Sequence, residues 1–220
     1  MEIYGQCKPY TMTSPERMYS LYKSIEYTLN NDIKGDFVEC GVWRGGSSML
    51  IALTLLQKGI SNRNIYCYDT FEGMSTPTEV DLAHSGESAH QLLSEQDKLK
   101  EDSVWCYSPL EAVKKNLLST GYPEKHLFFV KGKVEDTLPS TTPANISLLR
   151  LDTDWYESTR VEMDILYPLL QEQGILIIDD FGFWEGARRA IVEYFEKKGQ
   201  KPYLHRIDDT GRLVIKTNSR

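Results

Sequence analysis

The sequence lacks any hydrophobic run long enough to cross a lipid bilayer. A membrane-spanning helix needs about 20 consecutive apolar residues, and no stretch of the 220 residues approaches that length. The first 18 residues also lack the charged and then apolar layout of a secretory signal. We therefore expect a cytoplasmic protein with no membrane partner.

Cysteine is scarce and is not arranged to bind metal. The chain has four cysteines, none in a Cys-x-x-Cys pair and none with a histidine at metal-ligand spacing: Cys7, Cys40, Cys67 and Cys106. Two of them, Cys40 and Cys67, fall in predicted strands, where a buried free thiol is the usual state. This pattern is typical of a reduced, cytoplasmic protein.

Positive charge is also in short supply. Lysine plus arginine number 25 and aspartate plus glutamate number 32, which gives a formal net charge of −7. An acidic chain with no basic run is a poor binder of nucleic acid, so we expect no nucleic-acid partner. The length fits one domain, residues 1–220, with a full hydrophobic core.

What the chain does contain is a regular alternation of strand and helix patterns. Nearly unbroken apolar runs predict strands at 35–41, 64–69, 126–132, 146–152 and 174–180. Helical spacing of apolar residues predicts helices at 14–30, 47–58, 108–121, 156–170 and 184–198, with Ser14 and Ser108 as caps. Alternation of this kind indicates an α/β fold with a doubly wound, mainly parallel sheet. The run 203–216 contains Asp-Asp-Thr-Gly and predicts a hairpin that adds one antiparallel strand at the edge.

One long polar segment, residues 72–107, does not fit the alternation. Connections of this length are usually disordered or cover an active site. Because the segment leaves the second strand at the edge where such sheets bind ligands, we predict a lid.

A glycine-containing loop follows the first strand. It reads Glu-Cys-Gly-Val-Trp-Arg-Gly-Gly-Ser-Ser from Glu39 to Ser48. Its first two glycines, Gly41 and Gly45, are four residues apart, which does not match the Gly-x-Gly-x-x-Gly of dinucleotide binders. Glu39 favours a cationic ligand over a pyrophosphate, and Asp69 after the second strand suits a ribose diol. The combination suggests S-adenosylmethionine, although a tight turn that serves only packing would leave the same pattern.

Aspartates follow two of the predicted strands. Asp152 and Asp154 end one, and Asp179 and Asp180 end the other. If the strands are neighbours, each pair of carboxylates at about 5 Å and a dielectric of about 20 repels by roughly 3 kcal/mol. A hard divalent cation, Mg²⁺ before Zn²⁺, would relieve that repulsion. Helix capping is the alternative role for Asp154.

Five motifs together resemble the macrocin O-methyltransferase family, whose members methylate sugar hydroxyls of antibiotics. They are GDFVECGVWRGGSSML, YDTFEGM, VEDTLP, LLRLDTDWYEST and LIIDDFGFWEGAR, and the resemblance runs from about residue 13 to residue 214. It implies a class I methyltransferase fold, Rossmann-like, with a seven-stranded sheet and a reversed final hairpin. It also implies S-adenosylmethionine and Mg²⁺ as cofactors, and a homo-oligomer.

The resemblance assigns roles to residues of this chain. The implied metal ligands are Asp152, Asp179 and Asp180, and the implied general base is Asp154. The implied cofactor-binding residues are Glu39, Gly41, Gly45, Ser47 and Asp69, with Val134, Glu135 and Asp136 as weaker matches beside the adenine. Arg17 and Met18 are expected near the cofactor or the lid.

The expected reaction is therefore Mg²⁺-dependent transfer of a methyl group to a hydroxyl of a small molecule, in the first place a sugar. Two alternatives stay open. A catechol-type O-methyltransferase would use the same carboxylates on an aromatic diol. A nicotinamide-dependent sugar oxidoreductase would share the sheet, but its usual glycine spacing is missing.

Overall fold

A seven-stranded sheet forms the centre of the computed structural model, which describes residues 2–100 and 103–217. The strand order is β3-β2-β1-β4-β5-β7-β6. The strands are β1 Asp36–Cys40, β2 Ile65–Asp69, β3 Leu127–Lys131, β4 Ile146–Leu151, β5 Leu170–Ile178, β6 His205–Arg206 and β7 Arg212–Ile215. Neighbours from β3 to β5 pair in parallel, and β7 is antiparallel to both β5 and β6. The predicted α/β fold with a C-terminal antiparallel hairpin is confirmed.

The hairpin differs from the expectation in one detail. The antiparallel strand β7 lies inside the sheet, with Leu176 of β5 opposite Val214, and the two-residue strand β6 forms the edge. The second arm of the hairpin is the more apolar one, and Val214 is buried. It therefore takes the inner position, where both faces of the strand are covered.

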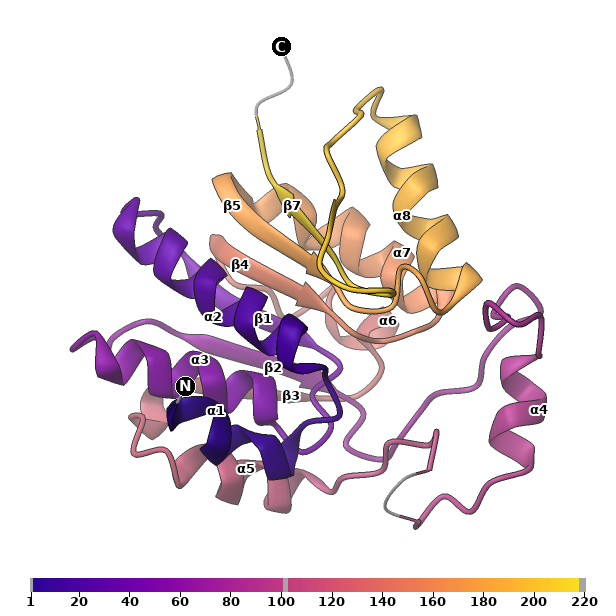
Figure 1. Ribbon diagram of the computed structural model, residues 1–220, viewed down its shortest axis with the longest axis horizontal. Helices are drawn as coiled ribbons and strands as arrows, with labels where there is room; N and C mark the ends of the chain where they lie inside the picture. The colour runs from indigo at the N-terminus through magenta and orange to yellow at the C-terminus, as the bar shows by residue number, and fades with distance from the viewer. Residues whose placement is uncertain (1, 101–102, 218–220) are drawn as a thin grey trace.

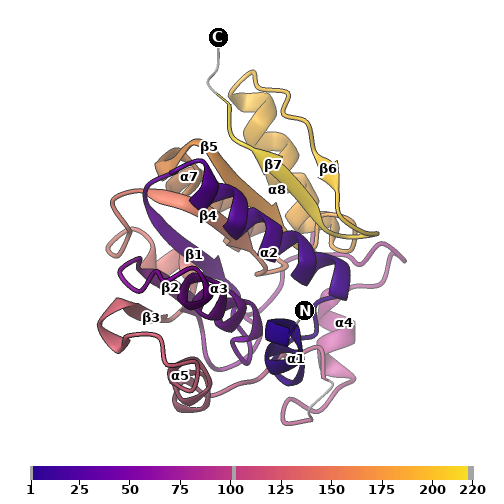
Figure 2. The same ribbon diagram turned by 60° about the vertical axis from the view of Figure 1, so that its left-hand side comes forward.

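Helices cover both faces of the sheet, as Figure 1 and Figure 2 show. One face carries α1 Glu2–Cys7, α2 Pro15–Asn30, α3 Gly46–Gln57 and α5 Leu110–Leu118, and the other carries α6 Val134–Thr137, α7 Tyr156–Ile165 and α8 Glu185–Lys197. Successive strand residues alternate between the two faces of the sheet. Phe37 packs in the hydrophobic cluster beneath α2 and α3, and Val38 packs in the cluster beneath α7 and α8. Glu39 follows in the alternation on the side of α2 and α3.

Two predicted helices are shorter than expected. The helix placed at 108–121 is α5, which begins after Pro109, so Ser108 is not its cap. The helix placed at 156–170 ends at Ile165 and gives way to a 3-10 turn, Tyr167–Leu169, that contains Pro168. A proline has no N–H for an α-helical hydrogen bond. Strand β5 then begins at Leu170, four residues earlier than predicted.

Residues 72–107 leave the carboxyl end of β2 and contain the helix α4, Ala89–Ser94. In Figure 1, α4 lies on the right, at the side toward which the parallel strands point. A small hydrophobic cluster joins the segment to the first turns of α7 and α8. Its buried members are Ala83, Ala89, Leu93, Trp155, Trp184 and Ala187.

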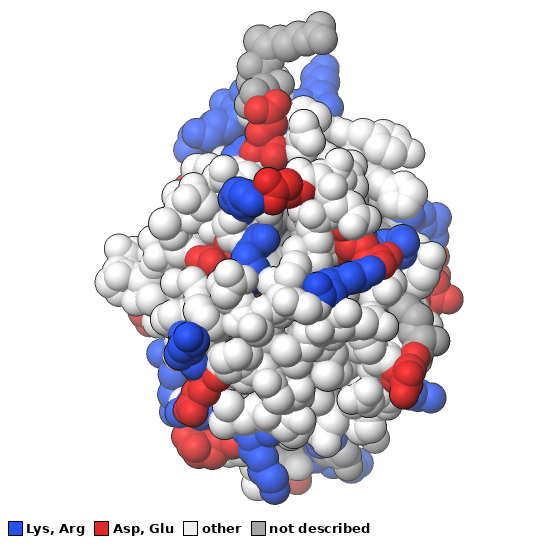
Figure 3. Space-filling view, turned by 90° about the vertical axis from the view of Figure 1, so that its left-hand side faces the viewer, with Lys and Arg blue, Asp and Glu red and all other residues white. Residues whose placement is uncertain are grey.

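The face at the opposite, amino ends of the strands carries charges of both signs, interspersed among uncharged residues, as Figure 3 shows. Positive charge is not gathered into a stripe on this face, in keeping with the net charge of −7. Among the described residues, no helix has the length and apolar character needed to span a bilayer.

Candidate active site

A cavity of about 280 Å³ opens at the carboxyl ends of β1, β2, β4 and β5. Its walls include Glu39, Gly41, Gly46, Ser47, Asp69, Val134, Glu135, Asp152, Asp154, Asp179 and Asp180. This is where open α/β sheets bind ligands, and the volume lies near the lower end of the range for small-molecule sites. Most of the predicted site residues therefore share one cavity. Gly45, Asp136 and Met18 are not among the lining residues.

The glycine loop turns sharply between β1 and α3. Gly41 has a φ of +82°, and a Cβ there would overlap the backbone carbonyl of Asp152. Gly45 has a φ of +91° and faces α5, where a Cβ would lie 2.5 Å from a methyl group of Leu117. Gly46 instead lines the cavity and packs against the backbone of Tyr10. Gly45 thus makes room for α5, and Gly46 makes room for residues 10 and 11 at the cavity wall.

Asp69 ties this loop to β2. One carboxylate oxygen accepts hydrogen bonds from the N–H groups of Val42 and Trp43, at 2.7 and 3.1 Å. The other accepts from the N–H of Phe71 at 2.6 Å. Burial raises the pKa of Asp69, and these N–H groups offset part of the rise. Two carboxylate oxygens offer about four acceptor positions. The Thr70 hydroxyl lies 3.5 Å from one of these oxygens, but its single proton is directed to the Gly73 carbonyl at 2.6 Å. Asp69 therefore keeps the capacity to accept one more hydrogen bond from a ligand in the cavity.

A buried ion pair lies beneath the cavity. Glu39 on β1 and Arg150 on β4 are register neighbours, only 1% and 2% exposed, and their side chains approach to 2.7 Å. Ser48 donates a hydrogen bond to the second oxygen of Glu39. Burial raises the pKa of Glu39, and the charge of Arg150 opposes that rise. Sequence reasoning missed Arg150, although an arginine inside an apolar strand signals a buried partner.

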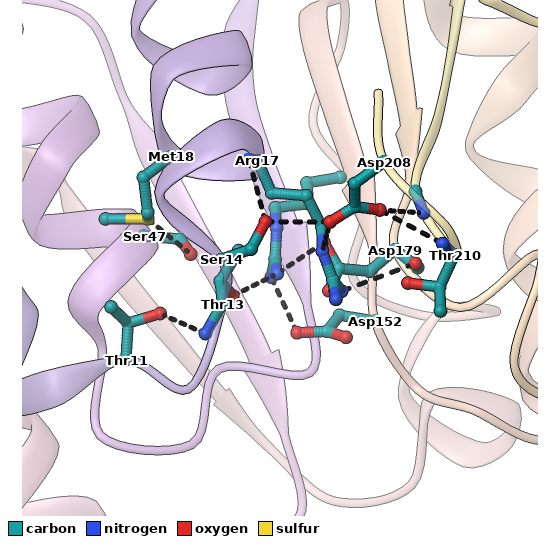
Figure 4. A network of polar contacts seen from close by, with 12 residues as sticks. Thr11, Thr13, Ser14, Arg17, Met18, Ser47, Asp152, Asp179, Asp208 and Thr210 are labelled. Atoms are coloured by element: carbon teal, nitrogen blue, oxygen red, sulfur yellow. Dashed lines mark hydrogen bonds and ion pairs between the residues drawn. The ribbon is translucent and has the colours of Figure 1, made fainter. Parts of the chain in front are cut away.

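Arg150 and Arg17 together hold Asp179. Arg150 lies 2.8 Å from Asp179 and 2.8 Å from Asp152. Arg17, from the first turn of α2, pairs with the other oxygen of Asp179 and with Asp208. Figure 4 shows the side chain of Arg17 reaching toward Asp179 and Asp208. Each oxygen of Asp179 thus faces an arginine, and the two arginines are shared with Glu39, Asp152 and Asp208.

The remaining three aspartates form an acidic cluster. Asp152, Asp154 and Asp180 each offer one oxygen, and these oxygens lie within 4.8 Å of one another. Desolvation raises the pKa of Asp152 and of Asp180 well above the ordinary range, and it raises the pKa of Asp154 to about 7. An all-oxygen set of this kind matches the ligands of Mg²⁺. The cluster therefore fits a hard divalent cation.

The other predicted residues fall into two groups. Val134 and Glu135, at the start of α6, line the cavity, whereas Asp136 is exposed outside it. Met18 is buried in the core, and its sulfur lies 3.9 Å from the Ser47 hydroxyl. No sequence pattern indicated residues 10–13, which form part of the cavity wall: Tyr10, Thr11, Met12 and Thr13.

The fold and this site define a class I O-methyltransferase, and comparison with known proteins identifies the family. The family model described as macrocin-O-methyltransferase matches residues 6–215, so the chain belongs to that family. This membership decides against the nicotinamide-dependent oxidoreductase considered above.

Three relatives illustrate the similarity. The chain is 34% identical to 8-demethyl-8-(2,3-dimethoxy-alpha-L-rhamnosyl)-tetracenomycin-C 4'-O-methyltransferase of Streptomyces olivaceus, over 92% of this chain and 74% of that protein. It is 29% identical to demethyldecarbamoylnovobiocin O-methyltransferase of Streptomyces niveus, again over 92% and 74%. The solved structure of the O-methyltransferase NovP superposes with a TM-score of 0.80 at 29% identity, over 95% of this chain and 83% of that one.

Proposed function

We propose that this protein transfers a methyl group from S-adenosylmethionine to a hydroxyl of a sugar, free or attached to a natural product, with Mg²⁺ as cofactor. The observation that carries the proposal is that the glycine loop, Asp69 and the acidic cluster line one cavity. The names of the relatives, which include a rhamnosyl tetracenomycin and a novobiocin methyltransferase, support a glycoside acceptor rather than a catechol.

The donor site is assigned to the part of the cavity that borders β1 and β2. Asp69 would accept a hydrogen bond from the ribose, and Gly41 and Gly46 let the loop pack closely against Asp152 and Tyr10 where it lines the cavity. Val134 and Glu135 would flank the adenine. S-adenosylmethionine supplies an electrophilic methyl group on a sulfonium centre, and the negative charge of the neighbouring carboxylates suits that cation.

The metal site is assigned to Asp152, Asp179 and Asp180. The geometry supports Asp152 and Asp180 directly, because their oxygens belong to the acidic cluster. Asp179 rests on the family resemblance alone, because Arg17 and Arg150 hold its carboxylate. A bound Mg²⁺ supplies Lewis-acid chemistry, which lowers the pKa of a hydroxyl.

Asp154 is assigned as the general base. Its carboxylate lies in the cluster beside Asp152, and its pKa, raised by desolvation to about 7, suits proton transfer near neutral pH. In the proposed reaction, the acceptor hydroxyl gives its proton to a carboxylate oxygen of Asp154 while the acceptor oxygen forms a bond to the methyl carbon. The carbon–sulfur bond of the sulfonium breaks in the same step, and S-adenosylhomocysteine leaves. Residues 72–107, acting as a lid, would exclude water from the site. A site without water favours the reaction of the cationic sulfonium with the acceptor oxygen, which gains negative charge as it loses its proton.

A methyl-transfer assay tests this proposal. Purified protein is incubated with S-adenosylmethionine, Mg²⁺ and methyl α-L-rhamnopyranoside or a rhamnosylated aromatic polyketide, and products are identified by mass spectrometry. We expect transfer that EDTA abolishes and that Asp154→Asn reduces strongly. The matched control is Asp164→Asn, at an exposed carboxylate on α7, which we expect to behave as wild type. Transfer to 3,4-dihydroxybenzoate but to no glycoside would favour the catechol alternative.

Two further proposals rest on the sequence and the family. We propose a homo-oligomer, a dimer or larger, which sedimentation equilibrium would test. We propose a cytoplasmic location, which fractionation of the native cell would test.

A further inference from the structure

Asp81 is a fully buried carboxylate outside the cavity, with an exposed fraction of 0%. One of its oxygens accepts hydrogen bonds from the N–H and the hydroxyl of Thr78, at 2.6 and 2.8 Å. The other accepts a hydrogen bond from the N–H of Tyr156 at 2.8 Å. Asp81 therefore joins residues 75–89 to the first residue of α7.

This contact satisfies the start of α7. The first N–H groups of a helix have no partner within the helix. The side chain of Trp155, at the N-cap position, accepts no hydrogen bond from the first N–H groups of the helix, so Asp81 supplies the cap from 75 residues away. A carboxylate at this position also interacts favourably with the helix dipole.

Trp155 is held by the same stretch of chain. Its indole N–H donates to the carbonyl of Ser75 at 3.0 Å. Its ring meets the edge of Trp184, with ring centroids 4.9 Å apart, and Trp184 forms a β-bridge with Ala83. Both residues that follow Asp154 are thus fixed by residues 75–89.

Asp154 itself has an unusual backbone. Its φ of +68° lies in the left-handed region, which costs free energy for a residue other than glycine. Such a conformation persists only when the surroundings enforce it. A hydrogen bond of 2.7 Å from the N–H of Trp155 to the carbonyl of Thr153 closes a turn around Asp154, and the hydroxyl of Ser158 contacts the carbonyls of Thr153 and Trp155. Residues 75–89 hold the two residues that follow Asp154, through the indole of Trp155 and the N–H of Tyr156.

We propose that Asp81 is a positioning residue. By capping α7 at Tyr156, it holds Asp154 in the left-handed conformation that brings its carboxylate into the acidic cluster. This inference rests on the role proposed above for Asp154. It makes Ser75 and Asp81 part of the support for Asp154, through their contacts with Trp155 and Tyr156, although Asp81 does not touch the cavity.

Two variants disturb the contact in different ways. Asp81→Ala removes the carboxylate. Gly186→Ala leaves Asp81 in place, but the new Cβ on α8 would overlap its oxygen and lie 3.0 Å from the N of Tyr156. The control is Glu79→Gln, which removes a negative charge from an exposed position on the same stretch. If one variant fails to fold, the other still tests the proposal.

The first readout is hydrogen exchange of the Tyr156 amide, which needs no acceptor. Loss of one hydrogen bond to a charged group should speed its exchange by about tenfold or more in both variants, and Glu79→Gln should match the wild type. Unchanged exchange in a folded variant would overturn the proposal.

The second readout is the turnover number in the rhamnoside assay. A displaced base should lower it by about a hundredfold with little change in S-adenosylhomocysteine affinity. Because Asp81 acts through Asp154, the double variant with Asp154→Asn should be no slower than Asp154→Asn alone. Additive losses of turnover in the double variant would overturn the positioning role of Asp81. Faster exchange of the Tyr156 amide with normal turnover would also overturn it. If the wild type methylates no probe, the proposed function fails. A crystal structure of Gly186→Ala then tests this inference, and a φ of Asp154 that stays near +68° would overturn it.

Discussion

Glu39 and Arg150 form an ion pair between adjacent central strands, 2.7 Å apart and almost inaccessible to solvent. Arg150 also contacts Asp152 and Asp179, so one guanidinium links the glycine loop's strand to the acidic cluster. Six carboxylates surround only two guanidinium groups here: Glu39, Asp152, Asp154, Asp179, Asp180 and Asp208 against Arg17 and Arg150. Acidic groups therefore outnumber basic ones in the site, which suits a cationic ligand once the carboxylates are ionised.

Removing Arg150 should destabilise the fold severely. Arg150→Met leaves Glu39 buried without its partner, and a broken buried pair costs roughly 3–5 kcal/mol in the free energy of unfolding. Urea denaturation measures the loss. As a control, Arg160→Met breaks an ion pair with Glu157 in which both side chains are 45% exposed, and should cost less than about 1 kcal/mol. The double variant Glu39→Gln with Arg150→Met should recover part of the stability, and no recovery would contradict the pairing argument.

Gly41 should not tolerate a side chain. Gly41→Ala places a methyl group inside the backbone of Asp152 and requires a φ of +82°. We expect a large fall in the melting temperature and loss of S-adenosylhomocysteine binding by calorimetry. Gly59→Ala is the matched control, because Gly59 has a φ of +72° with nothing within 4 Å of the added methyl. It should cost about 1 kcal/mol of strain and leave binding intact. Equal effects of the two variants would contradict the steric explanation.

Binding of Mg²⁺ should strengthen as the pH rises. Desolvation raises the pKa of Asp152 and Asp180, and raises that of Asp154 to about 7, so protons occupy the cluster at acidic pH. A cation must displace those protons, and its apparent affinity then increases with pH. Calorimetric titration with Mg²⁺ at pH values of about 6 and about 8 should show tighter binding at the higher pH, with protons released. Equal affinity at both would mean that the cluster is already ionised.

Asp208 should contribute stability that is lost in acid. Burial alone would raise its pKa, but hydrogen bonds from Gly211 N–H and Ser14 and the charge of Arg17 lower it to about 2. A pKa below the unfolded value of about 3.9 favours the folded state above that pH, and the gain disappears as the pH falls toward 2. Asp208→Asn should therefore flatten the decline of the melting temperature between pH of about 4 and 2. The control Asp209→Asn, at a neighbouring side chain that is 93% exposed, should retain the decline.

The sheet was predicted well from the sequence, because its strands are nearly unbroken apolar runs that lack the ~3.6-residue period of an amphipathic helix. The ends of two elements were predicted less well. Pro168 ends one helix early. The pairing of β4 with β5 shifts register between Ile146 and Leu148, and Ile146 pairs with Leu170, which therefore belongs to β5. The aspartates were found because they follow strands that turn out to be neighbours. Contacts between distant residues were not predictable: no local pattern shows that Asp81 caps α7 or that Arg17 pairs with Asp179.

We propose above that the cavity beside the glycine loop holds S-adenosylmethionine. Calorimetric titration of the purified protein with S-adenosylhomocysteine, and with NAD⁺ as a control, tests it most directly. We predict one site per chain with a dissociation constant on the order of micromolar, equivalent to about −8 kcal/mol, and no binding of NAD⁺. Binding of NAD⁺ without binding of S-adenosylhomocysteine would contradict the assignment of the cavity and of the reaction.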